Sequence, residues 1–331
     1  VPHQTPRPRS LAQIRIQQIR FIMPYPIDKK FVVAVTSSAL FDMRESNDVF
    51  HNKGIEAYRK YQDENIDNPL YKGVAFPFIK RLLSLNDSFP SIKPIEVVLF
   101  SKNSPETGLR AFRSIAHYQL DISRACFSSG NSNFQYLSPF NAALFLSDNE
   151  NDTKAAIEAG YAAGTVINGG IKDDESDCQL RLAFDFDGVL GDDSAEAFYK
   201  SVDGNMNQYY QHEKDLSSTP LSFGPIGRVL QKISEFQKME IKKQQKDNNY
   251  IPLLKTAIVT ARNAPAHERV VTSLREWGVE VDEAFFLGGM EKSRILEVLK
   301  PHIFFDDQMT HLEKLKNIPA VHVPFGIANK Q

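Results

Sequence analysis

The chain has little cysteine, a single tryptophan and no excess of either charge. Its two cysteines, Cys126 and Cys178, are too few for a disulfide framework or a cysteine metal site. That count is typical of a reducing compartment, so we expect a cytoplasmic protein. The 39 Lys and Arg residues against 41 Asp and Glu give a formal net charge of −2, which argues against a nucleic-acid partner. No apolar run approaches the ~18 residues that would predict a membrane span.

Acidic residues are also missing from the first 22 positions, which are rich in Pro, Arg and Gln. An Arg-rich, acid-free start is typical of a transit peptide. The interpretation that we favour is an extension over residues 1–22 that is non-native or disordered, with the natural start at Met23. It is favoured because an apolar strand pattern begins within a few residues of Met23.

A pair of aspartates stands out behind an apolar run, in RLAFDFDGVLGDD at residues 181–193. Alternate residues of a strand point to the same side, so Asp185 and Asp187 should leave the strand together, with Gly188 permitting a sharp turn. Two carboxylates this close repel each other unless a cation or a shared proton holds them. The pattern therefore indicates a metal-assisted reaction on an anion.

The second half of the chain repeats the pattern of the first. Residues 32–43 match residues 182–193 at an offset of 150, and residues 97–105 correspond to residues 257–265. Glycines and prolines fall into register as well as apolar residues. We therefore favour duplication of a whole domain over the general likeness of any two α/β patterns.

Short apolar strands alternate with amphipathic helices in each half, which predicts parallel sheets with helices on both faces. We expect an α/β fold of two Rossmann-like domains related by internal duplication, over residues 23–175 and 176–331. Residues from about 194 to 250 are predicted to form a small helical cap. In such sheets ligands bind beyond the carboxyl ends of the strands.

Polar motifs follow one another at predicted strand and helix ends in the second half. They are the pair Asp185 and Asp187, then Thr260, Lys292 and the pair Asp306 and Asp307. Taken singly, the threonine fits a turn, the lysine a solvated position and the last pair a helix cap. The ordered set is far more specific than any member.

These residue types suit phosphoryl transfer. Asp185 can attack phosphorus and form an aspartyl-phosphate, while Asp187 can protonate the leaving oxygen and later deprotonate water. Thr260 can hold phosphate oxygens, and Lys292 supplies a positive charge. For Mg²⁺, which prefers hard oxygen ligands, the candidates are Asp185, Asp187, Asp306 and Asp307.

The order Asp-x-Asp, Thr, Lys, Asp-Asp resembles that of the haloacid dehalogenase superfamily of phosphatases. The wider sequence resembles the cytosolic 5′-nucleotidases of type I, in segments such as VVLFSKNSPETGLRAFRSI and TARNAPAHERVVTSLREWGVEVDEAFFLGG. The segments that carry the resemblance, of which these are two, span about residues 31–326. The resemblance implies domains of the haloacid dehalogenase type and Mg²⁺-dependent hydrolysis of nucleoside 5′-monophosphates, of the AMP, IMP or deoxynucleotide class. One difference is Asp-Phe-Asp-Gly where the family has Asp-Gly-Asp-Ala, and Phe186 should point away from the aspartates.

The first half has lost the carboxylates. At the offset of 150, Asp185 corresponds to Val35 and Asp187 to Ser37. We therefore expect a degenerate, catalytically inactive domain. Hydroxyl, amine and amide groups near its strand ends could still hold a regulatory nucleotide, although turns and helix starts explain the same residues: Thr36, Ser37, Ser38, Ser101, Lys102 and Asn103.

Recognition of the nucleoside is less well defined. Arg262, Asn263 and His267 follow Thr260 and could contact phosphate or ribose, although His267 fits a helix start equally well. Phe134 and Tyr136 could stack on a base, although such aromatics more often belong to a core.

Two further functions stay open from the sequence. One is a phosphatase that acts on another small phosphomonoester, and the other is a non-catalytic nucleotide-binding protein. The presence of every motif favours an enzyme. Oligomerisation is left open.

Overall fold

The computed structural model describes residues 25–167 and 173–329, and the predicted extension with its start at Met23 lies outside them. In the first half the strands are β1 (Phe31–Thr36), β4 (Ile95–Ser101), β5 (Arg124–Phe127), β6 (Ala142–Ser147) and β7 (Ala163–Ile167). In the second half they are β8 (Leu180–Phe184), β9 (Leu254–Thr260), β10 (Glu283–Phe286), β11 (Ile303–Asp306) and β12 (Ala320–His322). A short antiparallel pair, β2 (Phe41–Asp42) and β3 (Tyr71–Lys72), lies apart from these strands.

The ten longer strands form one sheet in the order β10-β9-β8-β11-β12-β7-β6-β1-β4-β5. Within each half every pairing is parallel. The halves meet where β12 pairs with β7 in antiparallel register, with Val321 opposite Val166. The two sheets predicted from the sequence are therefore joined edge to edge into a single, mostly parallel sheet.

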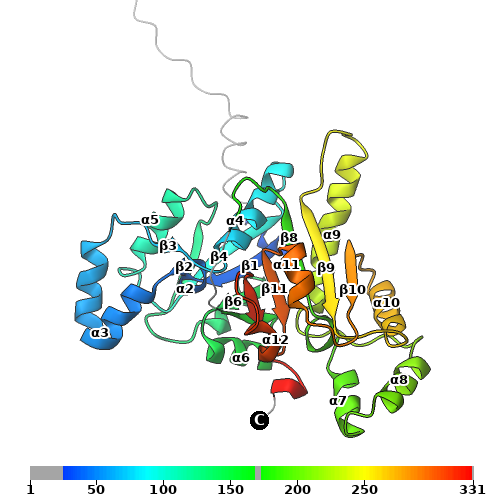
Figure 1. Ribbon diagram of the computed structural model, residues 1–331. Helices are drawn as coiled ribbons and strands as arrows, with labels where there is room; N and C mark the ends of the chain where they lie inside the picture. The colour runs from blue at the N-terminus through cyan, green and yellow to red at the C-terminus, as the bar shows by residue number, and fades with distance from the viewer. Residues whose placement is uncertain (1–24, 168–172, 330–331) are drawn as a thin grey trace, which may run out of the picture.

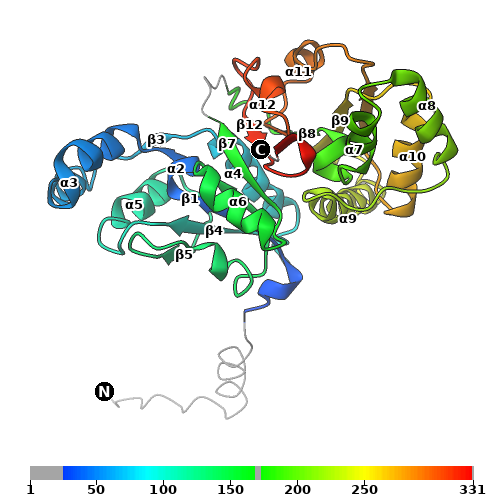
Figure 2. The same cartoon turned by 90° about the horizontal axis from the view of Figure 1, so that it is seen from below.

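Helices cover both faces of the sheet, as Figures 1 and 2 show. Residues of β1 alternate between two apolar clusters: Val33 and Val35 face the main core, whereas Val32 and Ala34 face a second cluster. On the main-core face lie α4 (Phe76–Ser84), α5 (Leu109–His117), α9 (Gly227–Gln244) and α10 (His267–Glu276). On the other face lie α6 (Glu150–Glu158), α11 (Ser293–Leu299) and α12 (Met309–Leu312). The short α2 (Ser37–Leu40) follows β1, and α3 (Arg44–Glu64) reaches outward from the first half.

Two helices of the second half are set apart from the sheet. They are α7 (Ser194–Ser201) and α8 (Met206–Asp215), seen at the lower right of Figure 1. By contrast, α9 packs Leu230 and Ile233 into the main core. The segment of about 194–250 predicted as a cap thus divides: residues 194–215 stand off the sheet, and α9 belongs to its helical layer. None of the helices in residues 25–167 and 173–329 has the length and apolar character to cross a membrane.

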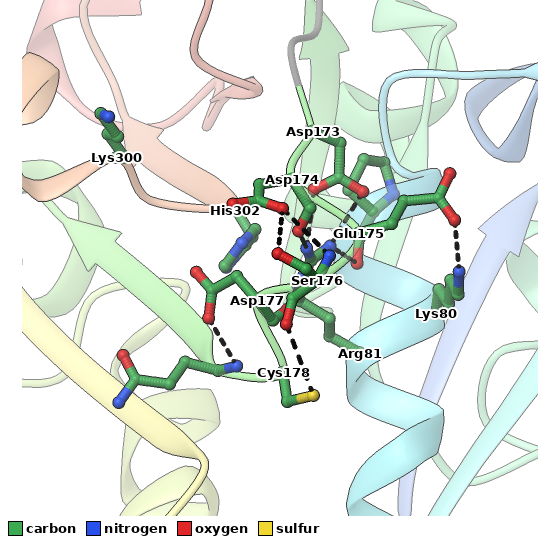
Figure 3. Close-up of polar contacts among 12 residues, drawn as sticks. Lys80, Arg81, Asp173, Asp174, Glu175, Ser176, Asp177, Cys178, Lys300 and His302 are labelled. Carbon is green, nitrogen blue, oxygen red and sulfur yellow. Dashed lines mark hydrogen bonds and ion pairs between the residues drawn. The ribbon is translucent and has the colours of Figure 1, made fainter.

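A short segment at residues 173–178 lies between the two halves and is held in place by ion pairs and hydrogen bonds (Figure 3). Arg81 of α4, only 5% exposed, pairs with the carboxylate of Asp173 at 2.8 Å. Its guanidinium also donates to the carbonyl oxygens of Asp174 at 2.8 Å and Asp177 at 3.1 Å. Arg181 at the start of β8 pairs with the Asp177 carboxylate at 2.5 Å. The connection is therefore fixed to both halves.

Candidate active site

The carboxyl ends of three neighbouring strands bring the predicted motifs together. β8 lies between β9 and β11 in the sheet, so the residues that end these strands share one edge. Asp185 follows β8 directly, Thr260 ends β9 and Asp306 ends β11. Each is at most 5% exposed.

Lys292 joins two of these carboxylates. Its Nζ lies 2.7 Å from Oδ2 of Asp185 and 2.7 Å from Oδ2 of Asp306. The lysine immediately precedes α11 and is 5% exposed, so the solvated position considered from the sequence does not apply. The second oxygen of Asp185 accepts a 2.7 Å hydrogen bond from the backbone N–H of Phe186. These two contacts orient the Asp185 carboxylate, with Lys292 as its positively charged partner.

Burial and charge act in opposite directions on these groups. Burial raises the pKa of Asp185 to about 6, while Lys292 works against the rise and Asp306 adds to it. Burial would also raise the pKa of Asp306, but Lys292 and His311 overcome it and lower that pKa. For Lys292, burial favours the neutral amine, and the two carboxylates more than offset this, so its pKa is raised. Lys292 is therefore cationic, and Asp306 is ionised.

Asp307 is the least compensated group of the site. It is 2% exposed, and neither carboxylate oxygen has a hydrogen-bond partner among the described residues. Burial, followed by repulsion from Asp185 and Asp306, raises its pKa to about 9. A buried carboxylate without a partner is costly unless a cation lies beside it.

The buried donors of the site suit a divalent cation. Ligand atoms of Asp185, Asp306 and His311 lie within 4.8 Å of one another. Asp307 lies near enough to Asp185 and Asp306 for their charges to raise its pKa. Gly188 borders Asp307, because a Cβ at this position would lie 2.4 Å from Oδ2 of that residue. Carboxylate oxygens in a compact, buried cluster are the donor set of a hard cation.

Asp187 is held elsewhere, although it was predicted as a metal ligand. Both of its oxygens are bound by Arg262, with Nε at 2.7 Å and a terminal nitrogen at 2.6 Å. Arg262 is 4% exposed and also pairs with Glu213, which lies on α8 and is fully buried. Arg269 of α10 pairs with the other oxygen of Glu213 at 2.9 Å. The arginine thus connects the stand-off helices to the aspartate.

The remaining predicted site residues surround β9 or lie in the first half. The Thr260 hydroxyl accepts a 3.2 Å hydrogen bond from the backbone N–H of Arg262. Asn263 packs against Gly288, and His267 begins α10 with its ring 5.7 Å from that of Phe286. Phe134 packs against the second apolar cluster of the first half, and Tyr136 of the same short helix is 43% exposed. Phe186 is fully buried and stacks on Trp277 at 5.8 Å, and the guanidinium of Arg262 lies 5.7 Å from the centre of its ring.

The matching edge of the first half carries hydroxyls in place of carboxylates. The Ser37 and Ser101 hydroxyls lie 3.0 Å apart, and the Thr36 hydroxyl donates to Asp148 at 3.3 Å. Lys102, which corresponds to Arg262, pairs with Asp152 at 2.8 Å. These groups satisfy one another, as expected of turn and helix-start residues.

Sequence reasoning missed several residues beside the aspartates. Glu213 and Arg269 make the ion pairs described above, and Nδ1 of His311 lies 3.1 Å from Oδ2 of Asp306. Tyr209 of α8 lies near enough to Arg262 and Asp187 for their charges to act on its hydroxyl. A charged residue in a polar helix is expected to be exposed to solvent, so nothing in the local sequence indicated that Glu213 is buried. His311 stands five residues after Asp306, a spacing that could have marked it as a neighbour.

Buried carboxylates and a buried lysine at the carboxyl edge of a mostly parallel sheet, beside two stand-off helices, define an α/β protein with a charged site at its sheet edge. The comparisons with known proteins give the family. The chain belongs to the 5′-nucleotidase family, whose model matches residues 23–330. It is 34% identical over 306 residues to human cytosolic 5′-nucleotidase 1B, covering 90% of this chain and 49% of that protein. The chain therefore spans about half the length of this relative.

Among solved structures, a candidate beta-phosphoglucomutase from Thermotoga maritima aligns with 44% of this chain and 89% of its own. The identity is 12% and the TM-score 0.31.

Proposed function

We propose that this chain is a Mg²⁺-dependent 5′-nucleotidase, a phosphoric monoester hydrolase that converts nucleoside 5′-monophosphates to nucleoside and phosphate. The observation that carries the proposal is the buried cluster in which Lys292 lies 2.7 Å from both Asp185 and Asp306. Membership of the 5′-nucleotidase family supports the substrate class. A cytoplasmic location is part of the proposal and is supported by the word "cytosolic" in the name of the human relative.

The proposed reaction begins with Asp185. Its carboxylate oxygen forms a bond to phosphorus as the bond from phosphorus to the nucleoside 5′-oxygen breaks. Asp187 gives a proton to that leaving oxygen. Asp187 then takes a proton from a water molecule, which attacks the phosphorus of the aspartyl-phosphate and releases phosphate. Lys292 and the Thr260 hydroxyl hold phosphate oxygens during both steps.

Asp185, Asp306 and Asp307 are the residues proposed to hold Mg²⁺. The unpartnered oxygens of the buried Asp307 are the observation that supports this assignment. When bound, the cation supplies positive charge that offsets repulsion between the carboxylates and the phosphate. Asp187 contributes to this set less readily because Arg262 occupies both of its oxygens.

Nucleoside recognition is proposed for Arg262, Asn263 and His267, which follow Thr260 at the same sheet edge. His267 keeps a buried Nδ1 without a partner among the described residues, which supports a role for it. Stacking of the base on Phe134 and Tyr136 also stays a proposal, with Tyr136 the more accessible ring.

We also propose that the halves arose by duplication and act as two domains, 23–175 and 176–331. The strand orders β7-β6-β1-β4-β5 and β12-β11-β8-β9-β10 support this, because corresponding strands hold corresponding places. The first half is then the non-catalytic copy. A regulatory nucleotide at its hydroxyl-lined edge would lose its effect on rate in a Ser37→Ala, Lys102→Met double variant.

The substrate class is tested by phosphate release from a panel of phosphomonoesters in the presence of Mg²⁺. The panel contains AMP, IMP, dAMP, a sugar phosphate and a short-chain phosphate. Highest kcat/KM for a nucleoside monophosphate supports the proposal. Preference for a sugar phosphate would show that the protein is a phosphatase of another small phosphomonoester. No phosphate release from any compound would favour a non-catalytic nucleotide-binding protein.

A further inference from the structure

A cluster of four charged side chains connects the stand-off helices to Asp187. Glu213 lies on α8, yet its side chain is fully buried and its partners belong to the loop after β9 and to α10. Arg269 Nε also donates to the carbonyl oxygen of Thr219 at 3.0 Å, just beyond α8. A fully buried glutamate paired with two arginines is costly to assemble and is retained only where its geometry is well satisfied.

Arg262 is shared between Glu213 and Asp187. One edge of its guanidinium, formed by Nε and a terminal nitrogen, donates to both oxygens of Asp187. The remaining terminal nitrogen donates to Glu213 and to the carbonyl oxygen of Ala266. Both hydrogen bonds that Asp187 accepts within the described residues come from this arginine. Two arginines therefore face two carboxylates in this cluster.

This sharing bears on the proposed proton transfer. Asp187 must turn from Arg262 toward the leaving oxygen before it can donate a proton there. Glu213 competes for the same guanidinium, so it weakens the hold of Arg262 on Asp187. Without the charge of Glu213, Arg262 would be balanced by Asp187 alone and would bind it more tightly.

We propose that Glu213 is a positioning residue of the hydrolysis: by sharing Arg262 with Asp187, it lets the position of α7 and α8 determine when Asp187 is free to reach the leaving group. The inference rests on the proposed function and adds a residue to it. Glu213 itself touches neither substrate nor reacting atoms.

The test compares two leaving groups in a Glu213→Gln variant. A nucleoside such as adenosine leaves from AMP only with a proton, whereas p-nitrophenolate leaves from p-nitrophenyl phosphate without one. The comparison uses kcat/KM, which reports formation of the aspartyl-phosphate and not its later hydrolysis, the step in which Asp187 acts on both substrates. We expect kcat/KM for AMP to fall about tenfold or more, and kcat/KM for p-nitrophenyl phosphate to change little. Asp187→Asn should give the same selective loss in kcat/KM, with a larger magnitude.

Asp215→Asn is the matched control, because Asp215 lies on the same helix, is exposed and bonds only to Gln211 among the described residues. It should leave the ratio of the two rates unchanged. Folding is checked by the fluorescence of Trp277, which is 7% exposed and stacks on Phe186 and Phe223. If Glu213→Gln does not fold, Glu213→Asp keeps the charge at shorter reach and should show a smaller selective loss.

Equal losses for both substrates, or no loss for either, would overturn the positioning role while leaving the nucleotidase proposal intact. Failure of the unaltered protein to hydrolyse any monophosphate would instead refute the proposed function.

Discussion

Asp185 and Asp187 are two positions apart and have different partners. Asp185 is 5% exposed and faces Lys292, whereas Asp187 faces Arg262. The lysine ammonium is a compact charge that contacts only one oxygen of the Asp185 carboxylate. The planar guanidinium of the arginine binds both oxygens of Asp187. The two carboxylates therefore lie in different electrostatic environments.

At the residue scale, Asp307 should make metal-free stability depend on pH. Its pKa is raised to about 9 from the usual 3.8, so the folded chain keeps a proton that the unfolded chain releases. The contribution of the protonated Asp307 carboxyl to the free energy of unfolding is therefore fully present below about pH 4. It is lost as the pH rises toward 9. Without metal, Asp307→Asn should flatten this decline and raise the free energy of unfolding at pH 8 by about 1–3 kcal/mol. Urea unfolding across this pH range measures it.

The Asp307→Asn variant also tests whether Asp307 binds the metal ion. Mg²⁺ should raise the Tm of the unaltered protein at pH 8 and leave that of Asp307→Asn nearly unchanged, because binding to the folded state alone stabilises it. An equal rise in both proteins would show that Asp307 does not hold the cation.

The sequence identified the residues of this edge by their order, not by their contacts. Thr260, Lys292 and Asp306 end or begin elements whose apolar patterns are clear, so their meeting at one sheet edge could be expected. Glu213 could not be found in this way, because it lies in the polar helix MNQYYQHEKD and its partners are 49 and 56 residues away. Burial of a charge in the tertiary structure leaves no local pattern.

At the scale of elements, the turn after β8 shapes the cluster. Gly188 has φ +70°, a conformation that side chains other than glycine rarely adopt, and it lies against Asp307. The turn carries Phe186 into the main core, which fixes the backbone between the two aspartates. The Phe186 ring is accommodated there by packing on Trp277.

Gly188→Ala should destabilise the protein by roughly 2 kcal/mol or more, through left-handed backbone strain and the clash with Asp307. Gly278→Ala is the matched control, because Gly278 also has a positive φ, of +66°, but nothing lies within 4 Å of a Cβ there. It should show the backbone cost alone. Equal costs by urea unfolding would mean that the space beside Asp307 is not tightly filled.

At the scale of the whole molecule, the halves share one sheet and one main core. Phe89, which follows α4, packs edge-on against Phe236 of α9 at 5.3 Å, and Lys243 donates to the carbonyl oxygen of Ser88 at 2.8 Å. Alternating strands and helices predicted the layers correctly. They did not predict the β7–β12 junction, because the short strand AVH carries no signal for its partner or direction.

A shared core predicts a single cooperative unfolding transition. Phe236→Ala, at a residue 6% exposed, should lower stability by about 3–5 kcal/mol and shift the entire transition. Calorimetry, far-ultraviolet circular dichroism and Trp277 fluorescence should give one coincident midpoint. Two transitions, with only the one reported by Trp277 displaced, would show that the halves unfold independently.

The central claim is that Asp185 attacks phosphorus, and it is tested most directly by the turnover of AMP with Mg²⁺ in Asp185→Asn. We expect kcat to fall by about a thousandfold or more while the fluorescence of Trp277 stays that of the folded protein. Turnover by a folded Asp185→Asn variant at the rate of the unaltered protein would contradict the account.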